Sequence, residues 1–112
     1  RPTRARLTPG PRSNWFEPAA LPLLLASSWS VTASSRVGVR LRGPFIDRLV
    51  DDELPSEGLV RGAIQVPPDG QPVMMLADHP TTGGYPVIAV VDPGDVAIVA
   101  QTAPGDTVAF TM

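Results

Sequence analysis

Cysteine is absent from this chain of 112 residues, and so is lysine, because all nine basic residues are arginines. Without cysteine the chain can form no disulfide framework, no thiolate nucleophile and no zinc site of the cysteine type. Without lysine it can form no Schiff base, present no P-loop lysine and carry no covalently attached biotin. Any of these groups would have to come from another chain or domain.

A net positive charge is lacking as well, since the formal net charge at pH 7 is -2. Binding to nucleic acid needs a basic face that neutralises phosphates, so we expect no nucleic-acid partner. Long apolar runs are scarce: the longest in the first half, residues 23–26, is far shorter than the stretch of about 20 residues that crosses a bilayer. The sequence therefore predicts a soluble, cytoplasmic protein without membrane contact.

The size and composition of the chain favour a single domain over residues 1–112. A chain of 112 residues is long enough to bury a core and too short for two domains. Its 14 prolines and 10 glycines approach the content of disordered chains, but a hydrophobic content of 43% favours a packed interior. Because the sequence opens on Arg1 without an initiator methionine or a signal pattern, we expect it to be part of a longer protein.

Short apolar alternations separated by turn residues predict a mostly β (α+β) fold, a barrel or sandwich with one or two short helices. Proline at a first helical position favours a helix from Pro18 to about Ser27, which Pro22 should shorten or kink. A second short helix is expected at 96–101, and the acidic segment 47–57 is interpreted as a surface loop. The expected strands are 4–8, 28–32, 37–42, 63–66, 73–77, 87–91 and 107–111.

Two turns flank the apolar strand at 73–77, whose methionines we interpret as core residues. The first, from Pro67 to Gly70, has an ordinary turn composition. The second, from Asp78 to Tyr85, gathers a carboxylate, an imidazole, hydroxyls and a phenol around two glycines, which let backbone amides approach a ligand closely. We expect the two turns to meet in one polar pocket, although a hairpin that simply needs Gly-Gly is the alternative.

Several polar residues near these turns have two interpretations. Gln65 either faces solvent, as alternation with its neighbours suggests, or binds a ligand. Arg36 either pairs with a carboxylate or phosphate or is solvated at a hairpin tip. His79 is either a general base or a solvated bystander, and the acids Asp51, Asp52 and Glu53 are either a metal or acid/base group or wet surface. Too few ligands cluster for a metal site, so we expect none.

The segment from Gly62 to Pro72 reads G-A-I-Q-V-P-P-D-G-Q-P and is followed by Ala77-Asp78 and by Thr81-Thr82-Gly83-Gly84-Tyr85-Pro86. This pattern resembles the KipA family, also called allophanate hydrolase subunit 2 or the biotin-dependent carboxyltransferase domain. Ser35-Arg36-Val37-Gly38 and Pro104-Gly105-Asp106 extend the resemblance over nearly the whole chain. Members of that family are considerably longer, so the chain resembles their C-terminal portion.

The resemblance implies a cyclophilin-like β-barrel, which we expect to be incomplete, with unpaired strand edges that promote association. It implies a KipI-like subunit 1 protein as partner and a small amide or lactam as substrate. Family members serve in ATP-dependent 5-oxoprolinase, in urea carboxylase, or as antagonists of a histidine-kinase inhibitor. ATP or carboxybiotin would then be supplied by other subunits or domains.

The leading hypothesis is therefore a fragment of an ATP-dependent 5-oxoprolinase or biotin-dependent carboxyltransferase-like enzyme, inactive in isolation and acting on 5-oxoproline or urea. An amide-lined turn with adjacent hydroxyls would stabilise charge on the substrate's carbonyl oxygen. The alternative is a non-catalytic regulatory module that binds a KipI-like partner. The catalytic candidates are Asp78, Tyr85 and Asp69, and the substrate-binding candidates are Gln65, Thr81, Thr82, Gly83, Gly84 and Arg36.

Overall fold

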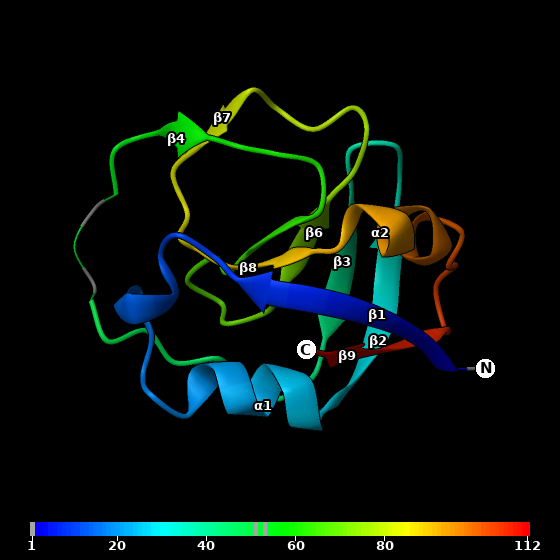
Figure 1. Cartoon of the computed structure of the whole chain (residues 1–112), viewed down its shortest axis with the longest axis horizontal. Coiled ribbons are helices and arrows are strands. Elements are labelled where there is room, and N and C mark those ends of the chain that lie inside the picture. Colours follow the sequence, from blue (N-terminus) through cyan, green and yellow to red (C-terminus); the bar gives the residue numbers. More distant parts are fainter. Residues whose placement is uncertain (1, 51, 53) are drawn as a thin grey trace.

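The computed structural model describes residues 2–50, 52 and 54–112, and in this part of the chain seven strands close into a barrel (Figure 1). Their order around the barrel is β1-β8-β5-β6-β3-β2-β9, and the mostly β class with short helices is confirmed. The barrel strands are β1 (Pro2–Pro9), β2 (Ser28–Ser34), β3 (Gly38–Arg42), β5 (Ala63–Gln65), β6 (Val73–Met75), β8 (Val87–Val91) and β9 (Thr107–Thr111).

The expectation of an incomplete barrel is wrong, because the first and last strands pair with each other. β1 runs parallel to β9, from Pro2 opposite Thr107 to Arg6 opposite Thr111, and its other edge pairs antiparallel with β8. Ala5 and Leu7 point inward and are 1% exposed, whereas Arg4 and Arg6, which alternate with them, point outward. Both edges of β1 are therefore paired within the barrel, so the expected association through open strand edges has no structural basis.

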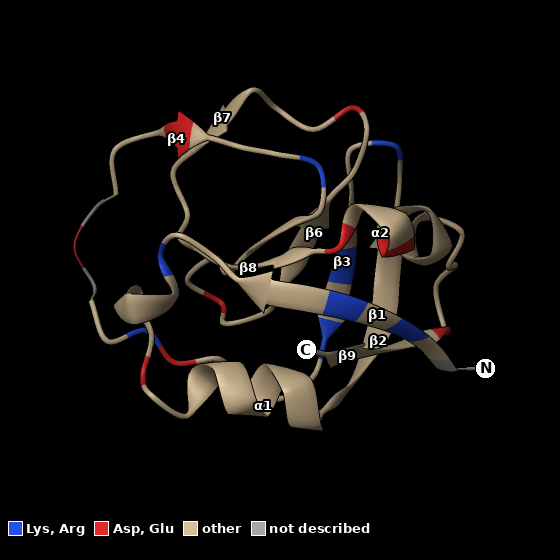
Figure 2. Cartoon of the chain, in the orientation of Figure 1, with Lys and Arg blue, Asp and Glu red and all other residues tan. Residues whose placement is uncertain are grey.

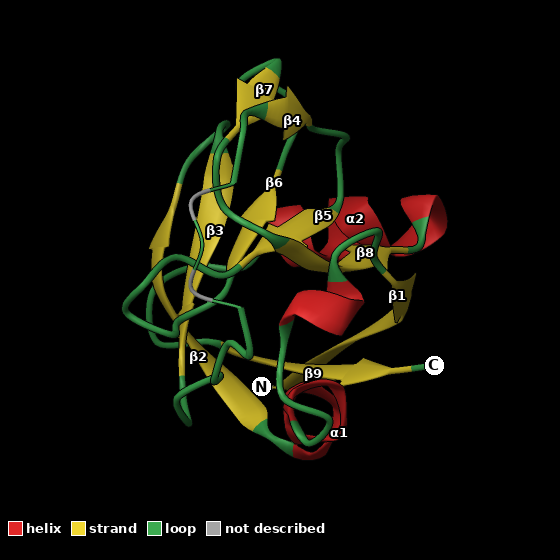
Figure 3. Cartoon of the chain, turned by 90° about the vertical axis from the view of Figure 1, so that its left-hand side faces the viewer, coloured by secondary structure: helices red, strands yellow, loops and turns green. Residues whose placement is uncertain are grey.

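The helices are short and close the barrel at its ends. α1 (Ala20–Ala26) lies against β9, α2 (Pro93–Ala100) lies against β1, and the 3-10 turn η1 is Ser13–Trp15 (Figures 1 and 3). No helix in the described residues has both the length and the apolar character that crossing a membrane requires.

Both helices begin at positions other than those expected. α1 starts two residues after Pro18, so Pro22 occupies its third position, where the backbone N–H needs no partner inside the helix. α2 begins earlier than expected because the Asp92 side chain accepts a hydrogen bond from the Gly94 amide at 2.9 Å and Pro93 takes a first-turn position.

The barrel interior is filled by the inward residues of every strand and is centred on Trp29. This side chain is fully buried, and its Nε1 donates to the carbonyl oxygen of Leu24 at 3.0 Å, which joins β2 to α1. The ring lies so close to Gly43 that a Cβ there would come within 2.6 Å of it. Met74 also belongs to this core, as its apolar character predicts.

A second, smaller apolar cluster covers the outside of the barrel. Met75 and Ala63 point outward from β6 and β5, and Leu59 packs on them from above. Leu59 follows β4 (Glu57–Gly58), which pairs with β7 (Thr82–Gly83) outside the barrel (Figures 1 and 3). We call these two short strands the β4–β7 arm. The outer face of β5 and β6 is therefore covered rather than solvated.

This cover explains why Gln65 departs from the solvent exposure that alternation suggests. Gln65 does alternate with its neighbours, but the face it points to is buried, and the residue is only 7% exposed. Val37, the first residue of the expected strand 37–42, instead precedes β3 in the hairpin turn and is 46% exposed. In the acidic segment Asp52 is exposed, whereas Asp51 and Glu53 lie outside the described residues.

Candidate functional site

A pocket of about 330 Å³ opens on the outer face of the barrel, beside the β4–β7 arm. The β2–β3 hairpin turn forms one wall, and the two turns that the sequence singled out form others. The predicted meeting of these turns is confirmed, because residues of both contribute to one pocket. Its lining residues are Ser35, Val37, Gly38, Arg40, Gln65, Pro67, Asp69, Val73, Met75, Pro80 and Tyr85.

The register of three barrel strands sets the spacing across this pocket. Arg40 on β3 lies opposite Val73 on β6, and Val73 lies opposite Gln65 on β5. Residues in register point to the same face, and neighbouring strands are about 4.8 Å apart, so the backbones of Arg40 and Gln65 are separated by about 10 Å. An apolar floor of Val73 and Met75 therefore lies between a guanidinium and a carboxamide.

The amide of Gln65 is held in place by the chain above it. Its Nε2 lies 3.5 Å from the carbonyl oxygen of Tyr85, at the limit of a hydrogen bond. A Cβ on Gly83 would come within 2.5 Å of the same Nε2, so only glycine lets the β7 backbone lie this close to the amide. Gln65 is the one buried polar member of the pocket lining.

Asp69 and Tyr85 enter the pocket from opposite turns. One carboxylate oxygen of Asp69 accepts a hydrogen bond from the Gln71 amide at 3.0 Å, which fixes the turn and leaves the second oxygen free to contact a ligand. The turn rests on Phe45, whose ring would clash with any Cβ at Gly70, where φ is +71°. Tyr85 is 46% exposed at the pocket mouth.

The other predicted site residues lie outside the pocket lining. Asp78 pairs with Arg36 at 3.0 Å on the exposed side of the hairpin turn, so each neutralises the other there. The His79 ring Nδ1 lies 2.6 Å from the carbonyl oxygen of the next residue and faces no carboxylate pair. Three further candidates are exposed and lie outside the pocket lining, namely Thr81, Thr82 and Gly84.

Arg40 is a pocket residue that we did not predict from the sequence. Alternation along β3 places Arg40 and Arg42 on the outer face, and the two arginines form the basic segments of that strand (Figure 2). The outer face has a pocket at Arg40 because of the register between β3 and β6. The available signal was the spacing of Arg40 after Gly38, where a Cβ would come within 2.8 Å of the Met74 carbonyl oxygen and 3.5 Å of Val73 Cγ1.

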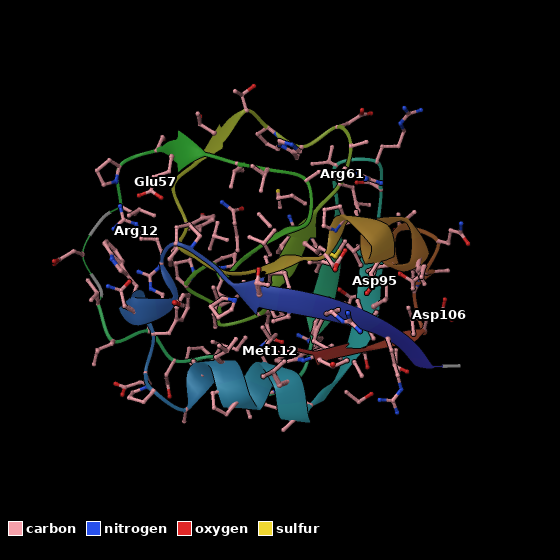
Figure 4. The ribbon with its side chains drawn as sticks, in the orientation of Figure 1. Arg12, Glu57, Arg61, Asp95, Asp106 and Met112 are labelled. Atoms are coloured by element: carbon pink, nitrogen blue, oxygen red, sulfur yellow. The ribbon has the colours of Figure 1, made fainter. Side chains whose placement is uncertain are left out.

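The far end of the β4–β7 arm is anchored by an ion pair. The Arg12 guanidinium donates to the Glu57 carboxylate through Nε at 2.8 Å and through Nη2, and it also stacks 5.3 Å from the centre of the Trp15 ring (Figure 4). The hydrogen bond to Glu57 raises the pKa of Arg12 above its ordinary value. The arm is thus held at one end by charge and at the other by Leu59.

Comparisons with known proteins agree with this architecture. The chain is 40% identical over 108 residues to the C subunit of 5-oxoprolinase from Escherichia coli K12, a match that covers 96% of this chain and 35% of that protein. It is 39% identical over 85 residues to the C subunit of 5-oxoprolinase from Haemophilus influenzae, a match that covers 75% of this chain and 28% of that protein. The chain therefore spans about a third of the length of these relatives.

Among solved structures, the urea amidolyase of Kluyveromyces lactis superposes with a TM-score of 0.89 at 29% identity, covering 97% of this chain and 7% of that one. The family described as carboxyltransferase domain, subdomain A and B, matches residues 1–112. The resemblance seen in the turn residues is thereby confirmed over the full sequence. The chain belongs to the carboxyltransferase domain family.

Proposed function

We propose that this chain contributes the outer-face pocket of a 5-oxoprolinase-type or carboxyltransferase-type complex that acts on a small amide or lactam. The observation that carries the proposal is the convergence of Gln65, Asp69 and Tyr85, from three separate segments, over one apolar floor. The two relatives named as 5-oxoprolinase subunits and the likeness to urea amidolyase support the same substrate class.

The pocket suits a flat molecule that carries an N–C=O group. Its apolar floor of Val73 and Met75 matches the face of a small ring, and its polar groups stand at the edges. The Gln65 carboxamide can donate from Nε2 to a carbonyl oxygen and accept at Oε1 from an amide N–H. Because this amide is already fixed beneath Gly83, it stabilises charge that develops on the carbonyl without reorganising.

Asp69 and Tyr85 supply the remaining polar contacts in this proposal. The Tyr85 hydroxyl donates to the substrate from the pocket mouth, and the free carboxylate oxygen of Asp69 orients the N–H side or accepts a proton from attacking water. In lactam opening, water adds to the carbonyl carbon, the C–N bond breaks, and the nitrogen leaves as an amine with the proton that Asp69 took from the water. Asp78, paired with Arg36, contributes to the shape of the hairpin wall in this scheme.

ATP or carboxybiotin belongs to the proposal as a group supplied by other subunits or domains, and a KipI-like subunit 1 protein is the proposed partner. The chain has no lysine to carry biotin covalently. When bound, such a group would supply the activated carboxyl or phosphoryl moiety.

The proposal is tested by producing the polypeptide that contains this chain together with a subunit 1 protein. ATP-dependent release of glutamate from 5-oxoproline, and ATP-dependent consumption of urea, are measured in parallel. We expect turnover of one of these amides, reduced about 10-fold or more in Tyr85→Phe by loss of one hydrogen bond. Tight pairing of the proteins without turnover of either amide would favour the regulatory module instead.

A Gly83→Ala variant is expected to bind the substrate about 10-fold more weakly, a change worth about 1.4 kcal/mol. The added methyl group would meet Nε2 of Gln65 at 2.5 Å and a methyl group of Leu59 at 2.9 Å. Both contacts are flexible side-chain ends, so the amide moves while the melting temperature changes little. The KM of the complex and a thermal melt of the variant measure the two effects.

Gly84→Ala is the matched control for this change. A Cβ at Gly84 would have only the Leu54 carbonyl oxygen nearby, at 3.7 Å, which is an ordinary contact. We expect its KM to equal that of the unmodified protein. Equal effects of the two substitutions would show that the position of the Gln65 amide does not matter for binding.

A further inference from the structure

Arg40 is the cation that the pocket lining holds among the described residues, and, like Arg42 beside it on β3, it forms no ion pair. Among the described residues, Arg12 pairs with Glu57 and Arg36 pairs with Asp78, whereas no carboxylate lies within 4.0 Å of the Arg40 guanidinium. Asp69 lines the same pocket without forming an ion pair with it. A guanidinium with no anionic partner, at the edge of a pocket, is available to bind an anionic ligand.

The β2–β3 hairpin is built so that this side chain faces the pocket. The register between the two strands shifts between Val31 and Ala33, which leaves Thr32 as the extra residue of a β-bulge opposite Arg40. The Thr32 hydroxyl donates to the Arg40 carbonyl oxygen at 3.3 Å. The bulge raises the twist of β2, whereas Arg40 keeps the regular alternation of β3 and points outward between the buried Val39 and Leu41.

The position of Arg40 relative to Gln65 restricts the ligand that could use both. The two residues lie on either side of Val73 in one row across three strands, with backbones about 10 Å apart. The side chains of Arg40 and Gln65 both reach over Val73. The gap between the guanidinium and the carboxamide is therefore about as wide as one small ring. A ligand that satisfies both ends has an N–C=O group at one end and an anion at the other.

We propose that Arg40 binds a carboxylate of the substrate and thereby selects a carboxylated cyclic amide over a neutral amide such as urea. This inference rests on the proposed function and names the substrate class of the same pocket. The lactam carbonyl is bound by Gln65, the ring lies on Val73 and Met75, and the carboxylate attached to the ring receives two N–H donors from the guanidinium. Binding of urea leaves this guanidinium without a partner.

The experiment uses the complete complex and separates the carboxylate from the ring. We compare the KM for 5-oxoproline with the inhibition constant of 2-pyrrolidinone, which has the same lactam ring without the carboxylate. Arg40→Gln is expected to raise the KM for 5-oxoproline about 10- to 100-fold, the range produced by losing a charge-assisted hydrogen bond, with kcat little changed. The inhibition constant of 2-pyrrolidinone stays the same.

Two further variants distinguish a direct contact between Arg40 and the substrate carboxylate from a general effect of positive charge on this face. Arg42→Gln removes the same charge from the same face of β3, two residues away, and is expected to leave the KM unchanged. Arg40→Lys restores the charge without the two-pronged geometry and recovers part of the affinity. Equal rises in KM for both Gln variants, or a parallel rise in the inhibition constant of 2-pyrrolidinone, would overturn the role of Arg40.

Failure of the proposed function gives a different result. If the unmodified complex turns over neither amide, binding of 5-oxoproline and of 2-pyrrolidinone to it is measured by calorimetry. If 5-oxoproline binds more tightly than 2-pyrrolidinone, and Arg40→Gln removes this difference, then Arg40 contacts the carboxylate even though the protein is not the enzyme. Equal binding of the two compounds, or binding of neither, refutes it. A thermal melt of Arg40→Gln shows that this outward-facing variant is folded.

Discussion

A Trp29→Ala variant is expected to lose about 3–5 kcal/mol of the free energy of unfolding. The indole is fully buried at the centre of the barrel core and fills the space over Gly43. Its removal leaves a cavity and also leaves the Leu24 carbonyl oxygen without the hydrogen bond from Nε1. The loss is a large part of the total stability of a domain of this size, about 5–15 kcal/mol. Urea denaturation followed by far-UV circular dichroism measures it.

Leu49→Ala is the control for the loss of an apolar side chain. Leu49 is 57% exposed, so its truncation is expected to change the free energy of unfolding by less than about 0.5 kcal/mol. If Trp29→Ala costs no more than this control, the ring does not fill the barrel and β2 is wrongly placed.

A Gln65→Leu variant is expected to lower kcat of the complex about 100- to 1,000-fold while the chain remains folded. Leucine nearly matches glutamine in volume, so it fills the space beneath Gly83 and keeps the outer cluster closed. The fixed donor for the substrate's carbonyl oxygen is lost, and the remaining hydrogen bonds of the pocket cannot replace it. Single-turnover kinetics with saturating 5-oxoproline or urea separates this loss from weaker binding.

Gln101→Leu serves as the control because it makes the same substitution on exposed surface at the end of α2. We expect its kcat to remain that of the unmodified complex. A Gln65→Leu complex that retains full kcat would remove the amide from the mechanism and leave the pocket as a binding surface alone.

Elements with local signals could be predicted from the sequence. Residues 87–91 and 107–111 form strands with the expected bounds, because apolar runs between proline and glycine turns specify such strands without help from distant residues. The turn at Pro67 to Gly70 was equally local. The meeting of the two turns around the pocket followed from their places on either side of one strand.

Features that depend on distant pairing could not be predicted. The burial of Gln65 requires the β4–β7 arm, whose strands are two residues long and carry no alternation of their own. The role of Arg40 in the pocket requires the register of β3 with β6, and closure of the barrel requires the parallel pairing of its first and last strands. Each of these three features depends on which strands pair and in which register, and neither residue propensity nor residue spacing determines that pairing.

The placement of the β4–β7 arm outside the barrel means that the cover over the Gln65 amide is not part of the barrel ladder. The arm shares only the two register pairs between its own strands, Glu57 with Gly83 and Gly58 with Thr82, and it rests on the barrel through Leu59 and the Arg12 pair. Local opening of such a segment costs far less than global unfolding. The Gln65 amide can therefore be uncovered by partial unfolding of this one segment while the seven-stranded ladder keeps its hydrogen bonds.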